Sequence, residues 1–213
     1  MPVVPLFDSQ AFILARPDSG AAQRYLRLHL EDLPRAYRIG FAAACVERHA
    51  PLLGGAAGVA SEAEELGIGL DLVWDSLLRQ AMDRDWLAGI LQASAELFRR
   101  RACGTEPGLR AMLACLEAAQ TGECEPVLRV SENLVRALET RAFAATGARR
   151  QDPGIRLERQ RQHRDLCELR RTAAAPSPNL IRRLRDRAAM EAAMPIEDWE
   201  SPAPQPAHRQ AAR

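Results

Sequence analysis

A histidine and a cysteine that could bind one metal ion stand four residues apart, at His163 and Cys167. On a helix this spacing places both side chains on one face, and imidazole and thiolate are common zinc ligands. A zinc site needs further ligands, and the sequence holds no second H-x-x-x-H, H-x-x-x-C or C-x-x-C element. We therefore expect no metal ion and no cofactor, and we interpret the pair as a surface histidine beside a half-buried thiol.

A cysteine, a glutamate and a histidine alternate at Cys45, Glu47 and His49. A thiol beside a histidine base could act as a nucleophile. Neighbouring members of this series, two residues apart, point in different directions on a helix, so these three residues alone are not expected to form a catalytic pair. Cys45 is interpreted as a small core residue. Because no other motif names a reaction, we expect a non-enzymatic protein without catalytic residues.

The segment between residues 52 and 60 is rich in glycine and precedes a predicted helix. Such a loop can hold phosphate groups with its backbone N–H groups, but that function is typical of the G-x-x-x-x-G-K-[ST] pattern. The pattern is absent, and the whole chain contains no lysine. We interpret the segment as a flexible loop.

Five acidic residues without an intervening basic residue lie between residues 62 and 75. Clustered carboxylates can serve acid–base or di-metal chemistry, but di-iron helical bundles use Glu-x-x-His motifs, and the sequence has none. A solvated acidic face is the favoured interpretation, with Asp71 and Asp75 expected to pair with arginines of a neighbouring helix. If the face has a function, we expect it to bind a basic partner rather than to catalyse a reaction.

The strongest charge asymmetry lies between residues 141 and 187, which hold thirteen arginines and five acidic residues. A basic helical surface is typical of nucleic-acid binding. Aromatic residues for base stacking are missing apart from Phe143, and no helix-turn-helix pattern is present, so a protein-facing or solvated patch is favoured. The two charged regions supply the candidate partner-binding residues Glu62, Glu64, Glu65, Arg156, Arg159, Arg164, Arg182 and Arg183.

Hydrophobic periodicity and the placement of proline and glycine predict about seven or eight helices and no strand. The expected helices cover residues 19–33, 34–49, 61–82, 83–101, 109–121, 126–147, 153–172 and 180–194. We therefore expect an all-α fold, a single-domain multi-helix bundle at 19–194. An irregular arm at 1–18 precedes it, and a disordered proline-rich tail at 195–213 follows it.

Two of these helices differ in how deeply we expect them to be buried. The segment Leu70–Leu78 is apolar on nearly every side, and we expect its Trp74 to form part of a buried spine in the middle of the core. The glycines at 67 and 69 favour a bend or a break just before it. The helix at 153–172 keeps only five apolar residues, so we expect it on the surface.

The composition places the chain among soluble globular proteins. Of its 213 residues, 47% are hydrophobic, which is enough for a buried core, and the formal net charge is +1. Five cysteines without a C-x-x-C pair favour free thiols in a reducing compartment. The N-terminus lacks the pattern of a signal peptide, and no window approaches the ~20 apolar residues that span a bilayer. We expect a soluble, cytoplasmic protein.

The chain contains two distinctive stretches, Phe41–Arg48 followed by Pro51, and Leu70–Leu77. They resemble the pair of signatures in the bacterial YjaG-like family of small helical proteins, a domain family of unknown function. The similarity continues through Ala111–Gly147 to Asp152, Pro153 and Glu158. The resemblance implies an all-helical cytoplasmic protein with no established activity or cofactor, so it transfers no catalytic role to any residue here.

These observations favour a non-enzymatic helical protein-interaction module. The acidic region at 62–75 and the basic region at 141–187 are both suited to steering a partner protein. An immunity or antitoxin-type protein that masks a toxin or effector is one such module. A nucleic-acid-associated factor that uses the arginine-rich helices at 141–187 is the alternative, and an enzyme with a metal site inside the bundle is a third hypothesis. A homo-oligomer is compatible with the sequence, and no membrane contact is expected.

Overall fold

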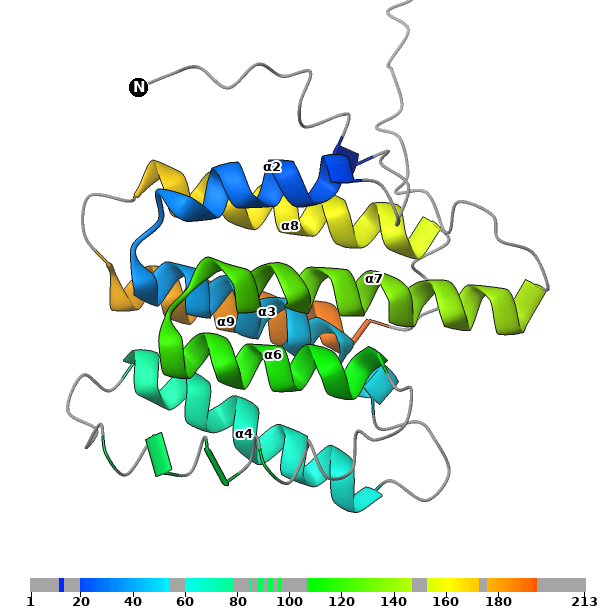
Figure 1. Ribbon diagram of the computed structural model, residues 1–213, viewed down its shortest axis with the longest axis horizontal. Coiled ribbons are helices and arrows are strands. Elements are labelled where there is room, and N and C mark those ends of the chain that lie inside the picture. The colour runs from blue at the N-terminus through cyan, green and yellow to red at the C-terminus, as the bar shows by residue number, and fades with distance from the viewer. Residues whose placement is uncertain are drawn as a thin grey trace, which may run out of the picture.

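The computed structural model describes residues 12–13, 20–53, 60–78, 107–146, 153–172 and 176–194, together with six residues between 85 and 96. Within these ranges the chain forms seven helices and no strand (Figure 1), which confirms the expected all-α bundle. The helices are α2 (Gly20–Glu31), α3 (Arg35–Leu53), α4 (Ala60–Leu78), α6 (Pro107–Thr121), α7 (Cys124–Thr146), α8 (Pro153–Arg171) and α9 (Pro178–Ala192). None of them is long and apolar enough to cross a membrane. The helix expected at 83–101, the tail at 195–213 and most of the arm at 1–18 lie outside the described residues.

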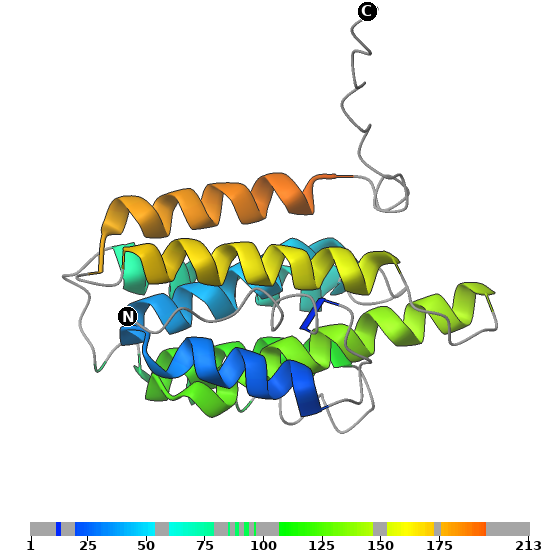
Figure 2. The same cartoon turned by 90° about the horizontal axis from the view of Figure 1, so that it is seen from above.

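The central helix of the bundle is α3, which packs against α4, α6, α7, α8 and α9. Figures 1 and 2 show its neighbours on several sides. Its small side chains Ala42, Ala43, Ala44 and Cys45 are fully buried. Short side chains let neighbouring helices approach closely. This alanine-rich segment therefore lets α3 pack closely against its neighbours.

In contrast, α4 lies on one side of the bundle. Trp74 is buried as expected, with 0% exposure, and its indole N–H donates to Glu47 of α3. Asp71 is exposed and pairs with Arg185 of α9, also as expected. Leu70, Val73 and Trp74 lie in the core and Leu77 and Leu78 pack against it, which confirms the expected burial of this segment. Among the described helices, however, α3 and not α4 packs against the most neighbours.

The two glycines of α4 do not interrupt the helix. It runs from Ala60 to Leu78, so the expected break near Gly67 is wrong. A Cβ atom at Gly69 would lie 3.0 Å from Cε of Met112 on α6, so glycine allows the two helices to pack closely here. This packing compensates for the low helix propensity of glycine.

An αα-hairpin is formed by α6 and α7, which correspond to the helices expected at 109–121 and 126–147. Gly122 follows α6 with a φ of +70°, and its N–H donates to the Ala118 carbonyl at 2.8 Å. Arg35 of α3 donates through Nη2 to the carbonyls of Ala119 at 3.1 Å and Gln120 at 2.8 Å. The left-handed glycine and the arginine thus satisfy carbonyl groups at the end of α6 that have no partner within the helix.

Prolines mark the starts of two helices near the C-terminus. Pro153 begins α8 and Pro178 begins α9, at positions where the missing N–H group is not needed. The sequence predicts that Pro51 ends the second helix, whereas α3 continues to Leu53. The loss of one backbone hydrogen bond is tolerated there because it falls in the last turn.

The deep burial of α8 contradicts its expected surface position. Nine of its 19 residues are buried, and five of these carry charged or amide side chains. They are Glu158, Arg159, Arg161, Gln162 and Asp165. The physical reason is that these polar groups form hydrogen bonds and ion pairs with groups outside α8. The helix can therefore be buried without leaving unpaired charges in the interior.

Phe12 belongs to the N-terminal arm and packs between α2 and α8. Its side chain is 1% exposed, and its ring stacks on Tyr25 with 4.5 Å between the ring centroids. Arg159 of α8 donates to the Phe12 carbonyl at 3.2 Å, and its guanidinium lies 5.9 Å from the ring centroid. This residue of the arm therefore packs onto the body of the bundle.

Candidate functional site

A fully buried arginine, Arg48 of α3, is held between two carboxylates of α8. Its Nε and Nη2 atoms each donate to Glu158 at 3.1 Å, and its Nη1 atom donates to Asp165 at 2.7 Å. All three side chains have 0% exposure. The contact with Glu158 is bidentate, which is the strongest geometry available to an arginine and a carboxylate.

The electrostatics of this group keep Arg48 and Glu158 charged. Burial alone would lower the pKa of Arg48, but Glu158 and Asp165 raise that pKa well above its usual value. Burial alone would raise the pKa of Glu158, but Arg48 holds that pKa below its usual value. Each charge therefore depends on the other for its stability in the interior.

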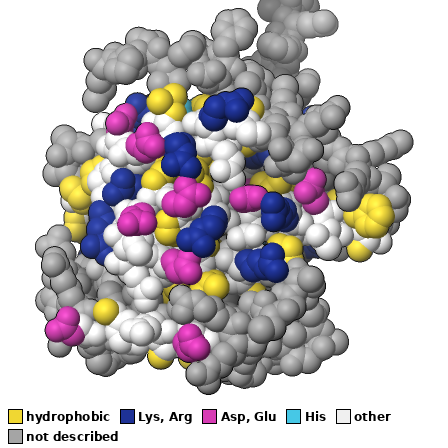
Figure 3. All heavy atoms as spheres, viewed as in Figure 1, with side chains coloured by type: hydrophobic (Ala, Val, Ile, Leu, Met, Phe, Trp, Pro, Cys, Tyr) yellow, Lys and Arg dark blue, Asp and Glu magenta, His cyan; other side chains and the backbone are white. Residues whose placement is uncertain are grey.

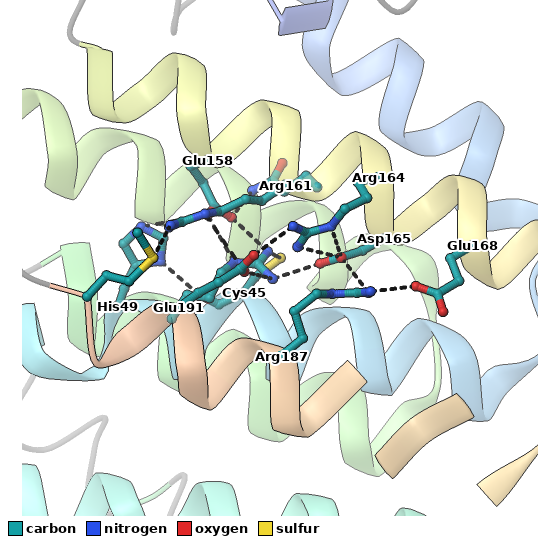
Figure 4. Close-up of polar contacts among 12 residues, drawn as sticks. Cys45, His49, Glu158, Arg161, Arg164, Asp165, Glu168, Arg187 and Glu191 are labelled. Atoms are coloured by element: carbon teal, nitrogen blue, oxygen red, sulfur yellow. Dashed lines mark hydrogen bonds and ion pairs between the residues drawn. The ribbon is translucent and has the colours of Figure 1, made fainter. Parts of the chain in front are cut away.

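The network continues from α8 to α9 (Figure 4). Glu191 of α9 pairs with Arg164 of α8 at 2.7 Å and lies 3.7 Å from Arg48. Arg187 of α9 donates to Asp165 at 2.9 Å. The Arg164 side chain is 42% exposed, so the network extends from the buried centre of the bundle to the surface between α8 and α9.

At its inner end the network contacts α7. Gln162 donates to Glu158 at 2.9 Å and accepts from the Ser131 hydroxyl of α7 at 2.9 Å. His49 Nε2 lies 3.9 Å from Glu158, while His49 Nδ1 donates to the Cys45 carbonyl at 2.9 Å. Burial lowers the pKa of His49, which favours a neutral imidazole. Four helices therefore contribute to one buried charge network.

The spacing of residues in α8 explains why its polar groups share the buried face. Intervals of three and four residues connect Ile155, Glu158, Gln162, Asp165 and Leu169. These intervals define one face of a helix, and the apolar residues at both ends show that the face is the buried one. Sequence reasoning missed this pattern because a count of apolar residues treats charged residues as solvent-facing.

Comparisons with known proteins identify the fold and give no activity. No model of a known protein family matches the chain, and no curated protein matches it. The chain shares its fold with a DUF416 family protein. That crystal structure, of a protein from Shewanella baltica OS155, has a TM-score of 0.55 and 16% sequence identity over 76% of this chain and 92% of that chain. At this identity the likeness shows the fold alone.

His163 and Cys167 form a small polar cluster with Tyr25 of α2. Cys167 Sγ lies 3.7 Å from His163 Nε2, and His163 Nδ1 shares a hydrogen bond of 2.5 Å with the Tyr25 hydroxyl. Burial raises the pKa of Cys167 and lowers the pKa of His163. A protonated thiol is a weak nucleophile. The residues that the structure describes contain no group of three potential metal ligands.

The interpretation of Cys45 as a core residue is confirmed. Its side chain has 0% exposure, and burial raises the pKa of the thiol well above its usual value. The sulfur accepts from Arg48 at 3.4 Å. The hydrogen bond of His49 goes to the Cys45 backbone carbonyl, so this contact does not activate the thiol.

The structure divides the candidate partner-binding arginines into two groups. Arg156, Arg182 and Arg183 are exposed, and Arg164 forms the exposed end of the charge network. Arg159 is only 2% exposed, so its assignment to a partner surface is corrected. It is buried because its guanidinium holds the N-terminal arm against α8.

The candidate acidic residues lie in the first two turns of α4. Glu62, Glu64 and Glu65 belong to this helix, but their side chains lie outside the described residues. Asp71 on the same helix forms an ion pair with Arg185. The structure thus shows a role within the fold for one member of the acidic region.

The outer surface of α9 presents apolar and basic side chains together. We define the α9 surface by its exposed residues Arg182, Arg183, Asp186, Ala189, Met190, Ala193 and Met194. Met190 is 72% exposed and Met194 is 44% exposed. The opposite side of the helix packs into the core through Leu184 and Ala188. Asp186 is the one carboxylate among these residues, and none of them is a cysteine, serine or histidine.

Proposed function

We propose that this protein is a non-enzymatic helical interaction module that binds a partner protein through the α9 surface and the adjoining exposed residues of α8. The observation that supports it is the exposure of Met190 on the same helix as Arg182 and Arg183, which are exposed and make no ion pair with a described residue. Exposed apolar side chains within a charged surface are typical of protein-binding sites. Arginine and methionine are also enriched at protein interfaces.

The charge of this region favours an acidic partner. Arg156, Arg171, Arg182 and Arg183 are exposed and make no ion pair with a described residue, whereas Asp186 is the one exposed acid on α9. Excess positive charge steers an acidic protein into contact and sets its orientation. The specific form we propose is an immunity or antitoxin-type protein that masks a toxin or effector.

The chain is also proposed to be a divergent member of the YjaG-like family. The two sequence stretches at residues 41–48 and 70–77 support this membership, and the fold likeness to a DUF416 family protein is compatible with it. The family has no established activity. Membership therefore leaves the identity of the partner open.

A nucleic-acid-associated factor is the second candidate, because the same exposed arginines could contact phosphates. Figure 3 shows one face of the molecule, on which basic and acidic side chains are interleaved over α2, α6 and α7. Such a mixed surface does not favour a phosphate backbone on that face. The exposed methionines of α9 add apolar area that phosphate contacts do not require. A protein partner is therefore favoured.

The test is affinity purification of the tagged full-length chain from its native host after cross-linking in the cell. We expect a protein partner in stoichiometric amount, and we expect the variant Arg182→Glu/Arg183→Glu to lose it. This variant reverses charge on α9 without altering the buried network. The control Arg110→Glu/Arg141→Glu makes the same charge change at exposed positions of α6 and α7.

Three results would contradict the proposal in different ways. Recovery of no stoichiometric protein partner would remove its basis. Recovery of nucleic acid, with binding that weakens steeply as salt rises, would favour the second candidate. A protein partner that the α9 variant and the control retain equally would show that the interface lies elsewhere.

A further inference from the structure

Two methionines at the C-terminal end of the α9 surface leave much of their apolar area in water. Met190 and Met194 are 72% and 44% exposed. Met190 lies in the last turn of α9, and Met194 follows the helix end at Ala192, with its N–H donating to the Glu191 carbonyl at 3.4 Å. Methionine side chains are flexible and polarizable, so they adapt to the apolar groups of a binding partner.

The methionines are backed by a firmly held part of the helix. Glu191, which lies between them in the sequence, pairs with Arg164 of α8 at 2.7 Å. Arg161 of α8 donates to Met194 Sδ at 3.9 Å. Ala188 is 1% exposed and packs in the core. The segment that carries the methionines is therefore held against α8 and the core by these contacts.

The α9 surface is also basic. Arg182 and Arg183 are exposed and lie about two helical turns before Met190 on the same helix. Ala189 and Ala193 are exposed small residues, which would allow another helix backbone to approach. Figure 2 shows α9 along one edge of the bundle with α8 beside it. A partner can therefore lie along the length of α9.

Resting on the proposed function, we propose that the partner docks an acidic amphipathic helix on the α9 surface. Its apolar side chains contact Met190 and Met194, and its carboxylates pair with Arg182 and Arg183. Helices bind to such surfaces through apolar residues spaced at three and four. Because α9 has 15 residues and spans about 22 Å, the matching helix has about four turns.

The positive charge of the α9 surface favours an acidic helix over a second copy of the chain as the bound molecule. An isologous contact through α9 would bring the same patch of two molecules together. Arg182 and Arg183 of each copy would then face a surface of the same net sign, with Asp186 as the one exposed acid on the helix. An acidic helix instead neutralises these arginines and still covers the methionines.

The test uses fluorescein-labelled peptides of about 18 residues, titrated with the full-length chain and followed by fluorescence anisotropy. The first peptide is an amphipathic helix with leucines on one face and glutamates on the other. The second replaces every glutamate by lysine. The third has the composition of the first, scrambled so that the leucines no longer form a stripe. We expect the first peptide to bind at least about tenfold tighter than either of the others.

Variants locate the bound peptide. Met190→Glu/Met194→Glu is expected to weaken the binding of the first peptide by at least about tenfold, because it removes the apolar contact and adds like charge. The control is Ile68→Glu on α4, which makes the same kind of change at a side chain that is 58% exposed. Circular dichroism of each variant, which should be unchanged, confirms that the bundle is folded.

Each result decides for or against the docking surface. Equal binding of the first and scrambled peptides, tighter binding of the lysine peptide, or unchanged binding to the methionine variant would overturn it. Equal weakening by the Ile68 control would overturn it as well. If the first peptide binds as expected while the host yields no protein partner, the proposed function fails and the docking surface stands. If a host partner is recovered equally by the methionine variant, the docking surface alone fails.

Discussion

Arg48 neutralises two carboxylates that have no access to solvent, so its replacement removes more than one ion pair. We expect Arg48→Met to lower the free energy of unfolding by about 3–5 kcal/mol, since it leaves Glu158 as an uncompensated buried charge and leaves Asp165 with only Arg164 and Arg187 as partners. Methionine has a similar length, so the loss comes mainly from charge rather than from an empty space. Urea denaturation of the variant and the parent measures the difference.

The matched control removes an arginine from an exposed ion pair. Arg27 and Glu125 lie 2.7 Å apart, with side chains that are 48% and 57% exposed. Surface pairs of this kind contribute about 0–1 kcal/mol, so Arg27→Ala should have little effect on the free energy of unfolding. Equal losses in the free energy of unfolding for Arg48→Met and Arg27→Ala would contradict the larger effect expected at the buried position.

Two buried groups near Arg48 make the stability fall as the pH is lowered. The folded-state pKa of His49 lies below its unfolded value, so the unfolded chain binds the proton more readily and stability declines as the pH falls below about 6.5. The folded-state pKa of Glu158 is also lowered, and its contribution is present above about pH 4.3 and is lost as the pH falls further. Both effects have the same sign.

Replacement of the histidine separates these two contributions. His49→Gln keeps a donor that can reach the Cys45 carbonyl but does not titrate. We expect a weaker dependence of the free energy of unfolding on pH between about pH 7 and pH 5 in this variant, with the decline below about pH 4.3 retained. Denaturation curves at a series of pH values measure both slopes. Identical slopes in variant and parent between pH 7 and 5 would contradict a buried neutral His49.

At the scale of helices, the glycines show how context decides the effect of one residue type. Gly122 has a φ of +70°, and a Cβ there would lie 2.5 Å from the Arg35 side chain. Gly122→Ala should therefore lower the free energy of unfolding by about 1–2 kcal/mol or more. Gly67 lies within α4 with nothing within 4 Å of an added Cβ, so Gly67→Ala should raise it by up to about 1 kcal/mol.

Thermal unfolding of the two glycine variants gives shifts of opposite sign if this account is right. Gly69→Ala provides an intermediate case, because its Cβ would meet Cε of Met112 at 3.0 Å. That methionine can move by a few tenths of an ångström, so a smaller change is expected than at Gly122. A stabilising Gly122→Ala would contradict the assigned role of the glycine in ending α6.

Helix positions could be predicted from the sequence where proline and glycine mark the ends. The bounds of α8 and the end of α6 at Gly122 follow from local rules that act within one turn. The depth of α8 could not be predicted in this way. Its Glu158 pairs with Arg48, which is 110 residues away in the sequence, so the compensation that permits burial exists only in the folded chain.

The candidate site was predictable to a similar degree. Arginine enrichment indicates a basic C-terminal region, and Arg156, Arg182 and Arg183 are exposed as that interpretation requires. The sequence does not separate these from Arg159, because the difference depends on the contact with Phe12. The exposure of Met190 is equally a tertiary property, since an apolar residue on a predicted helix is expected to face the core.

At the scale of the whole molecule, two kinds of contact join the helices around α3. Apolar packing connects α3 with α4, α6 and α7 and also includes α9. The charge network connects α3 with α8 and α9. Its ion pairs between these helices are made mainly by long arginine and glutamate side chains. The network requires a particular alignment of three helices, whereas apolar contacts tolerate small shifts.

This difference predicts how the stability of the bundle changes when Arg48, Glu158 and Asp165 are all replaced by apolar residues. In Arg48→Met/Glu158→Met/Asp165→Leu, no uncompensated charge remains from the triad. Gln162 keeps Ser131 and Arg164 keeps Glu191 as partners. We expect the free energy of unfolding to lie within about 2 kcal/mol of the parent, and therefore above that of Arg48→Met.

Urea denaturation compares the triple variant with the parent and with Arg48→Met, and amide NMR spectra report whether one ordered structure persists. If the network mainly fixes helix alignment, the triple variant remains stable but its amide resonances in α8 and α9 broaden, because apolar contacts allow several alignments. Sharp resonances at near-parental stability would show that packing alone sets the alignment. A triple variant less stable than Arg48→Met would contradict the view that uncompensated charge causes the loss in the single variant.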